Sequence, residues 1–209
     1  MTSTSATTFQ YPDSCIAMFA RAPVLGKVKT RLIPALGEQG ALDMHLHLMC
    51  RQIEVLNTLS NEMRCNSQLW VDQDIEHPEF KKFKGEMKLQ QGNDLGEKMY
   101  HAGQAVLREF SRVLIIGSDC PGLNEAYLEQ ALQTLEDEET DIVIGPALDG
   151  GYVLIAMKQA CKEIFQDIDW GTEQVLQQTL DKCHSNGLRL VRLSPLRDID
   201  TAEDLKSLL

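Results

Sequence analysis

The stretch RVLIIGSDCPGL, residues 112–123, decides the fold that the sequence predicts. Its apolar run is short and ends at Gly117, which is typical of a strand buried on both faces at the centre of an α/β sheet. Asp119 follows almost at once, so we expect one carboxylate at the carboxyl end of a central strand. Ligands of open α/β sheets bind outside those strand ends, and a carboxylate there can hold a divalent cation. The alternative is that Asp119 only caps the helix expected over 123–136.

Apolar runs and helical periodicities alternate along the rest of the chain. Short apolar runs predict further strands at 15–20, 67–71, 87–90, 142–144, 153–157 and 188–193. Helical spacing and capping residues predict helices over 38–59 and directly after Asp94, Thr172 and Asp200, the last with Glu203 at capping-box spacing. This alternation is typical of an α/β fold, so we expect a three-layer α/β/α sandwich around a mainly parallel mixed sheet.

Length and composition predict a single domain. The chain of 209 residues is long enough for one full core, which we place over 13–209, after a flexible Thr- and Ser-rich tail at 1–12. The formal charge of −11 argues against a nucleic acid polymer as partner, and no apolar run approaches the length of a membrane span. The six cysteines are scattered without a CxxC pair, which fits a reducing cytoplasm. The oligomeric state stays open.

A basic loop follows the first predicted strand. It carries four cations within eleven residues of an otherwise acidic chain: Arg21, Lys27, Lys29 and Arg31. Gly26 would let the backbone approach a ligand, so the loop is a candidate phosphate-binding site. It matches neither the P-loop pattern nor the dinucleotide pattern GxGxxG. The alternative is a solvated basic loop that balances nearby acidic residues.

A turn signal, Asp149-Gly150-Gly151, separates two predicted strands. This element would place Asp149 near the edge of the sheet, and the two glycines could bring backbone amides close to a sugar or a phosphate. The same residues are also consistent with an ordinary hairpin.

Aromatic and acidic residues occur in two later segments. Trp170 follows two aspartates and could be a platform for a sugar or a base, or simply cover the core. Asp198 lies just before the last predicted helix and is free to act as a ligand.

Several of these segments resemble a family of GT-A-like glycosyltransferases that is associated with arsenosugar biosynthesis and radical-SAM enzymes. The matching segments are FARAPVLGKVKTRL, QGNDLGEKM, IIGSDCPGL, GPALDGGYVLIAM, the Trp170 loop and RDIDTAEDL, in the order of the family. The resemblance spans nearly the whole chain after the tail and implies a nucleotide-diphospho-sugar transferase fold. More distantly, KTRL and DIDTAEDL are similar to segments of the phospholactate guanylyltransferases and the molybdenum-cofactor nucleotidyltransferases.

The resemblance also implies roles for particular residues. Asp119 matches the metal-binding aspartate for Mg²⁺ or Mn²⁺, but Ser118 and Cys120 flank it, so the segment is not a strict DxD motif. A second metal ligand must then come from elsewhere, and the candidates are Asp149, Asp198 and Asp200. Asp149 also matches a position near the acceptor and could act as a general base. The expected nucleotide or phosphate contacts are Arg21, Lys27, Lys29, Arg31 and Ser118, and the expected substrate contacts are Gly150, Gly151 and Trp170.

Three functions remain open from the sequence. The first is glycosyl transfer from a nucleotide-diphospho-sugar to a small acceptor. The second is nucleotidyl transfer, in which a phosphorylated small molecule attacks a nucleoside triphosphate and pyrophosphate leaves. A glycine-rich loop after the first strand would favour the second function, and this chain has only Gly26 there. The third is a sensor that binds a nucleotide without turning it over.

Overall fold

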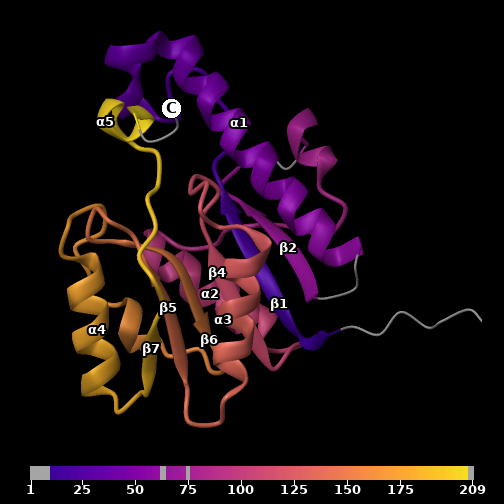
Figure 1. The fold of residues 1–209 in the computed structure, drawn as a ribbon, viewed down its shortest axis with the longest axis vertical. Helices are drawn as coiled ribbons and strands as arrows, with labels where there is room; N and C mark the ends of the chain where they lie inside the picture. The colour runs from indigo at the N-terminus through magenta and orange to yellow at the C-terminus, as the bar shows by residue number, and fades with distance from the viewer. Residues whose placement is uncertain (1–9, 62–64, 74–75, 207–209) are drawn as a thin grey trace, which may run out of the picture.

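Strand β4 (Arg112–Ile116) lies at the middle of a seven-stranded sheet. The structure is a computed structural model, and it describes residues 10–61, 65–73 and 76–206 (Figure 1). The order across the sheet is β3-β2-β1-β4-β6-β5-β7. The other strands are β1 (Tyr11–Ala20), β2 (Cys65–Val71), β3 (Glu86–Leu89), β5 (Ile142–Pro146), β6 (Tyr152–Met157) and β7 (Leu190–Arg192).

Among the seven strands that the structure describes, only β6 runs antiparallel to its neighbours. It pairs with β4 on one side and with β5 on the other, whereas all other pairs in the sheet are parallel. The reversal follows from the tight turn after β5, which sends the chain straight back along the sheet. The expected mainly parallel mixed sheet is therefore confirmed.

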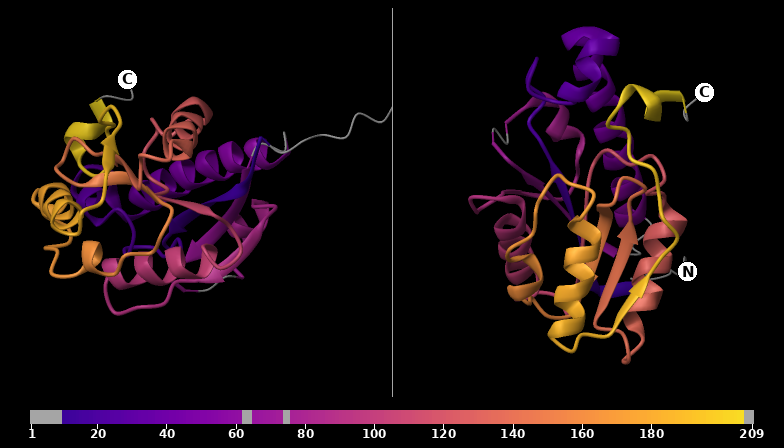
Figure 2. Two further views of the ribbon diagram at one scale, coloured as in Figure 1. Left: turned by 90° about the horizontal axis from the view of Figure 1, so that it is seen from below. Right: turned by 90° about the vertical axis from the view of Figure 1, so that its left-hand side faces the viewer.

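Helices cover both faces of this sheet (Figure 2). Within the described residues, the α-helices are α1 (Ile33–Asn61), α2 (Leu95–Val106), α3 (Glu125–Glu136), α4 (Val175–Ser185) and α5 (Ala202–Leu205). Apolar residues of α1 and α3, such as Ile53 and Leu128, pack on one face, and those of α2 and α4, such as Val106 and Cys183, pack on the other. Short 3₁₀ helices are η1 (Thr30–Leu32), η2 (Pro78–Lys82) and η3 (Glu163–Phe165). The three-layer sandwich is confirmed.

Strand β1 begins four residues earlier than the apolar run predicts. Tyr11, assigned to the tail in the sequence analysis, pairs with Cys65 of β2 and is only 3% exposed. Pro12 and Asp13 interrupt the apolar pattern, and the register shifts between Tyr11 and Cys15. The sequence signal is lost because the strand is irregular at this point, although Tyr11 belongs to the core.

Two predicted helix starts are also wrong. Helix α4 begins at Val175, because the Thr172 hydroxyl donates a hydrogen bond of 2.8 Å to the carbonyl of Asp169 instead of capping a helix that starts directly after it. The capping box of α5 is formed by Thr201 and Asp204, one residue later than the predicted pair. Asp204 Oδ2 accepts hydrogen bonds of 2.8 Å and 2.7 Å from the amide and hydroxyl of Thr201.

The C-terminal segment 193–201, here called the strap, brings the end of the chain back to the centre of the sheet. The Leu196 amide donates to the carbonyl of Pro146, and the Ile199 amide donates to the carbonyl of Asp119 at 3.2 Å. In Figure 1 the strap rises from β7 toward α5, which lies beside the start of α1. Buried Ile199 packs there with Leu32. The strap therefore places Asp198 and Asp200 on either side of a residue bonded to Asp119.

No helix in 10–61, 65–73 or 76–206 combines the length and the apolar character needed to cross a membrane.

Candidate functional site

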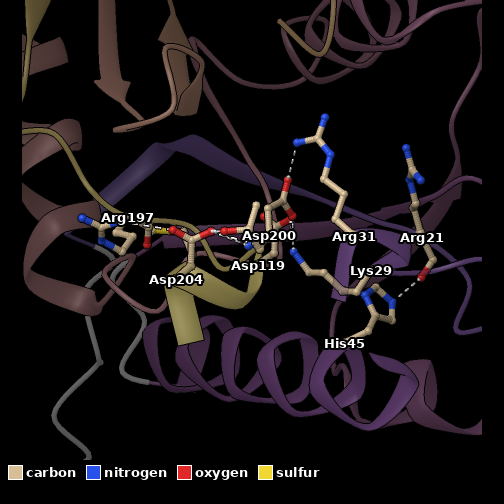
Figure 3. A network of polar contacts seen from close by, with 10 residues as sticks. Arg21, Lys29, Arg31, His45, Asp119, Arg197, Asp200 and Asp204 are labelled. Atoms are coloured by element: carbon tan, nitrogen blue, oxygen red, sulfur yellow. Dashed lines mark hydrogen bonds and ion pairs between the residues drawn. The ribbon is translucent and has the colours of Figure 1, made fainter. Parts of the chain in front are cut away.

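The acid at the end of β4 meets the basic loop at the same edge of the sheet. Lys29 Nζ donates hydrogen bonds of 2.9 Å to Asp119 Oδ2 and 2.8 Å to Asp200 Oδ1 (Figure 3). These three side chains come from the loop after β1, the end of β4 and the strap. Because β1 and β4 are parallel neighbours, their carboxyl ends lie together, and the expected meeting of the loop with Asp119 is confirmed.

Lys29 is the buried member of this group. Its side chain is 5% exposed, against 39% for Asp119 and 35% for Asp200. Burial alone would lower the pKa of Lys29, but the two carboxylates outweigh that effect and raise its pKa above the ordinary value. Lys29 is therefore a charged ammonium that is enclosed between two acids.

The other cations of the loop are solvent-exposed. Arg31 Nη1 lies 3.8 Å from Asp200 Oδ2, and its side chain is 62% exposed. Lys27 and Arg21 are also exposed. In Figure 3 the guanidinium groups of Arg21 and Arg31 extend away from α1. These three side chains, and not Lys29, have their charged ends available to an anionic ligand.

His45 supports the loop from α1, a role that the sequence analysis did not find. It is 5% exposed, and its Nε2 lies 3.0 Å from the carbonyl oxygen of Arg21, so Nε2 carries the proton and donates it. Burial lowers the pKa of His45; the Arg21 carbonyl opposes this effect and the charge of nearby Lys29 reinforces it. Helical spacing shows only that His45 and His47 do not share a face, and it carries no information about a contact with a loop 24 residues earlier.

Asp198 and Asp149 form a second acidic group next to the first. Burial, followed by the charges of Asp149, Asp119 and Asp200, raises the pKa of Asp198 to about 6. The turn that carries Asp149 is tied to the strap, because the Leu148 amide donates to the carbonyl of Leu196 at 2.9 Å. Asp149 and Asp198, two of the predicted second metal ligands, therefore lie near Asp119, and together these carboxylates give this part of the protein an excess of negative charge.

These residues fit a divalent cation. After burial, the negative charges of Asp149, Asp119 and Asp200 contribute to the raised pKa of Asp198. No cluster of three or more potential ligands is assembled among the described residues. Mg²⁺, however, is commonly held by one or two carboxylates together with substrate phosphates, and Asp119 with Asp198 supplies two.

The turn at 147–151 holds Asp149 through its own backbone. The Gly151 amide donates to Asp149 Oδ1 at 2.9 Å, and the Gly150 amide lies 3.4 Å from the carbonyl of Ala147. Both glycine amides thus have partners inside the turn, as in an ordinary hairpin, which was one of the two interpretations of this segment. Ser118 is buried at the end of β4, beside Asp119.

Gly150→Ala is expected to destabilise the protein by about 2 kcal/mol or more. Gly150 has φ +93°, and an added Cβ would collide with the carbonyl oxygen and Cα of Glu173. For a chain of this size the melting temperature should fall by about 4–8 °C. Thermal unfolding of Gly187→Ala is the matched control, because Gly187 also has positive φ but has open space around it. Equal losses in the two variants would contradict close packing at Gly150.

Trp170 lies with α2, on the sheet face opposite α1 and α3. It packs on the core of that face, edge-on to Tyr152 with ring centroids 6.3 Å apart. It also lines a cavity of about 370 Å³ with Tyr100 and Phe165, between the start of α2 and the loop after η3. The residue therefore both covers the core and borders an open space, so the two interpretations of the sequence are compatible.

Comparisons with known proteins place the chain in a family. A family model described as "Uncharacterized protein conserved in bacteria (DUF2064)" matches residues 55–172. A solved "putative nucleotide-diphospho-sugar transferase" from Desulfovibrio desulfuricans G20 is 35% identical over 94% of this chain and 86% of that chain, with a TM-score of 0.84. The chain belongs to the DUF2064 family. No curated protein matches the sequence of this DUF2064 member.

More distant structures share the fold. A CMP:2-keto-3-deoxy-manno-octonic acid synthetase complexed with CTP has 10% identity and a TM-score of 0.59, covering 94% of this chain and 96% of that chain. Glucosyl-3-phosphoglycerate synthase from Mycobacterium tuberculosis, solved with Mn²⁺ and UDP-glucose, has 10% identity and a TM-score of 0.58, covering 93% and 74%. At this identity the likeness shows the fold alone. The fold of this DUF2064 protein is that of the nucleotide-diphospho-sugar transferases, as the resemblance implied, and these structural neighbours are transferases.

Proposed function

We propose that this DUF2064 protein is a metal-dependent glycosyltransferase that moves a sugar from a nucleotide-diphospho-sugar to a small acceptor. The observation that carries the proposal is the meeting of Asp119, Lys29 and Asp200 at the carboxyl edge of the sheet, with exposed cations on one side. The relative with 35% identity supports it, because that protein is described as a "putative nucleotide-diphospho-sugar transferase".

The site for the sugar donor would combine carboxylates that bind a metal cation with cationic side chains that bind the diphosphate. Asp119, Asp198 and Asp200 are the candidate ligands of Mg²⁺ or Mn²⁺. A divalent cation bound there would polarise the diphosphate oxygens and offset the charge that develops as the nucleoside diphosphate leaves. Arg21, Lys27 and Arg31 would neutralise further phosphate charge from the exposed side of the loop, and Ser118 would add a hydroxyl contact at the end of β4.

Asp149 would act as the general base for the acceptor. Its Oδ1 is held by the Gly151 amide at 2.9 Å, so the orientation of the carboxylate is fixed by the turn. Its other oxygen would take the proton of the acceptor hydroxyl as that hydroxyl attacks the sugar carbon. Gly150 and Gly151 would act by shaping this turn, and Trp170, at the border of the cavity beside α2, would offer an aromatic face to the sugar or base.

The alternative is nucleotidyl transfer, in which a phosphate monoester attacks a nucleoside triphosphate and pyrophosphate leaves. The specific observation that favours it is the shared fold with a synthetase solved with CTP. The same acids and cations would serve either reaction. Both versions of the proposal include a cytoplasmic location, where the six free thiols would stay reduced.

Thermal shift measurements with a nucleotide panel separate these functions. We expect a UDP- or GDP-sugar to raise the melting temperature of the wild type, and the increase to grow with Mn²⁺, because binding only to the folded state stabilises it. Asp119→Asn is the control, and should lose the part of the increase that depends on Mn²⁺. Stabilisation by nucleoside triphosphates alone would contradict glycosyl transfer, and no stabilisation by any nucleotide would contradict both reactions.

A further inference from the structure

Lys29 does not have the exposure of a residue that binds an incoming phosphate. Its side chain is 5% exposed, whereas that of Arg31, two residues later, is 62% exposed. Two of its three ammonium protons are committed, at 2.9 Å to Asp119 and 2.8 Å to Asp200. Turning toward a phosphate would break both bonds and leave two acids without their nearest cation, which is unfavourable for partly buried charges.

The backbone around Lys29 is built to keep the ammonium in this position. Lys29 adopts a left-handed conformation with φ 46° and ψ 42°, which is rare for a residue other than glycine. Its carbonyl accepts a hydrogen bond of 2.8 Å from the amide of Leu32, the last residue of η1, and Leu32 is fully buried. A strained backbone conformation persists only where the surrounding structure fixes it. Here the two ion pairs and the Leu32 anchor supply that constraint.

Asp200 differs from Asp198 in its charged neighbours. Asp200 Oδ1 faces Lys29 at 2.8 Å and Asp200 Oδ2 faces Arg31 at 3.8 Å, so each oxygen has a cation. Asp198 directly precedes Ile199, whose amide donates to the carbonyl of Asp119 at 3.2 Å, and besides burial the charges of Asp149, Asp119 and Asp200 act on it. Asp119 forms its ion pair with Lys29 through Oδ2. Among the described residues, the four acids therefore divide into Asp200, whose two oxygens both face protein cations, and a set in which only Asp119 Oδ2 is paired with a cation.

We propose that Lys29 is a positioning residue, a built-in counter-ion that orients Asp119, and that Asp200 acts through Lys29 instead of binding the divalent cation. The cation would then be held by Asp119 and Asp198. This inference rests on the proposed function only in taking Asp119 as a metal ligand. Orientation of a metal ligand by a partner outside the coordination sphere is a general feature of metal sites.

The Mn²⁺ affinity of the nucleotide-free protein tests whether Asp198, and not Asp200, is a metal ligand. Measured by the electron paramagnetic resonance signal of free Mn²⁺, Asp198→Asn should weaken binding by about 10-fold or more. Asp200→Asn should have a clearly smaller effect, because Lys29 keeps its hydrogen bond to Asp119. Asp137→Asn is the matched control, because it makes the same chemical change at the end of α3, away from these acids, and it should leave the Mn²⁺ affinity unchanged. Equal losses in Asp198→Asn and Asp200→Asn would make Asp200 a ligand and overturn the proposal.

Stability of the metal-free protein tests the Lys29 pair separately. Lys29→Met should lower the melting temperature, and the double variant Lys29→Met/Asp200→Asn should regain part of that loss, because it removes an acid that has lost its buried partner. If Lys29→Met alone does not fold, a folded double variant gives the same result. Losses that simply add would overturn the inference. Failure of the wild type to bind Mn²⁺ would overturn the metal-dependent function, and the stability cycle would then decide the role of Lys29.

Discussion

Asp119→Asn is expected to reduce turnover by about 10³-fold while the protein stays folded. The variant replaces the proposed metal-binding carboxylate by an amide, which is a poor ligand for a hard cation and leaves the departing diphosphate without part of its charge stabilisation. The fold should survive because Asp119 is partly exposed and Lys29 keeps its bond to Asp200. Turnover is measured with the nucleotide that stabilises the wild type, and circular dichroism reports the fold.

Asp137→Asn is the matched control for this experiment. Asp137 lies at the end of α3, at the amino edge of the sheet, and its Oδ1 accepts a hydrogen bond from the amide of Glu139. The chemical change is the same, but it lies at the opposite edge from the proposed site, so turnover should stay at the wild-type level. A folded Asp119→Asn protein with unchanged turnover would remove Asp119 from the mechanism.

Asp198→Asn is expected to stabilise the metal-free protein at pH 7.5 while it abolishes tight Mn²⁺ binding. The pKa of Asp198 is raised from 3.8 to about 6 in the folded state, so the fold disfavours the ionised carboxylate. A difference of this size corresponds to ~3 kcal/mol, and solvent screening of this half-buried group reduces it to about 1 kcal/mol. The melting temperature should rise by about 2–4 °C.

The stabilisation by Asp198→Asn should depend on pH in a defined direction. The folded pKa of about 6 lies above the ordinary value of 3.8, so the penalty for ionising the carboxyl is fully present above about pH 6. As the pH falls from 6 toward 3.8, the folded protein takes up this proton before the unfolded chain does, and the advantage of the variant shrinks toward zero. Thermal unfolding in EDTA at pH 7.5 and pH 5 measures both values. A variant less stable than the wild type at pH 7.5 would show that the folded protein already neutralises Asp198.

Added Mn²⁺ should reverse the order of the two proteins at pH 7.5. The wild type gains stability because the cation binds only to the folded state, and the variant lacks one of the two proposed carboxylate ligands. Asp198, which costs stability in the metal-free protein, is thus one of the two acids that would bind the cation. Equal stabilisation of both proteins by Mn²⁺ would exclude Asp198 as a ligand.

The central part of the fold could be predicted from the sequence because its signals are local. Four consecutive apolar residues before Gly117 can be buried only in an inner strand, and β4 is the fourth of seven strands in the sheet. The cap of α2 was equally local, since Asp94 accepts a hydrogen bond from the Glu97 amide three residues later. The irregular start of β1 at Tyr11 was missed because Pro12 and Asp13 interrupt the apolar pattern.

By itself, the sequence determined the order of strands and helices, the basic loop after β1, and the carboxylate at the end of β4. Each of these depends on neighbouring residues and on the shared direction of parallel strands. Only the tertiary structure decided how the charges are paired. Lys29 and Asp200 are 171 positions apart, and their contact exists because the strap crosses the end of β4. Periodicity within one segment cannot predict which of several acids a distant lysine will meet, because that depends on the path of the chain between them.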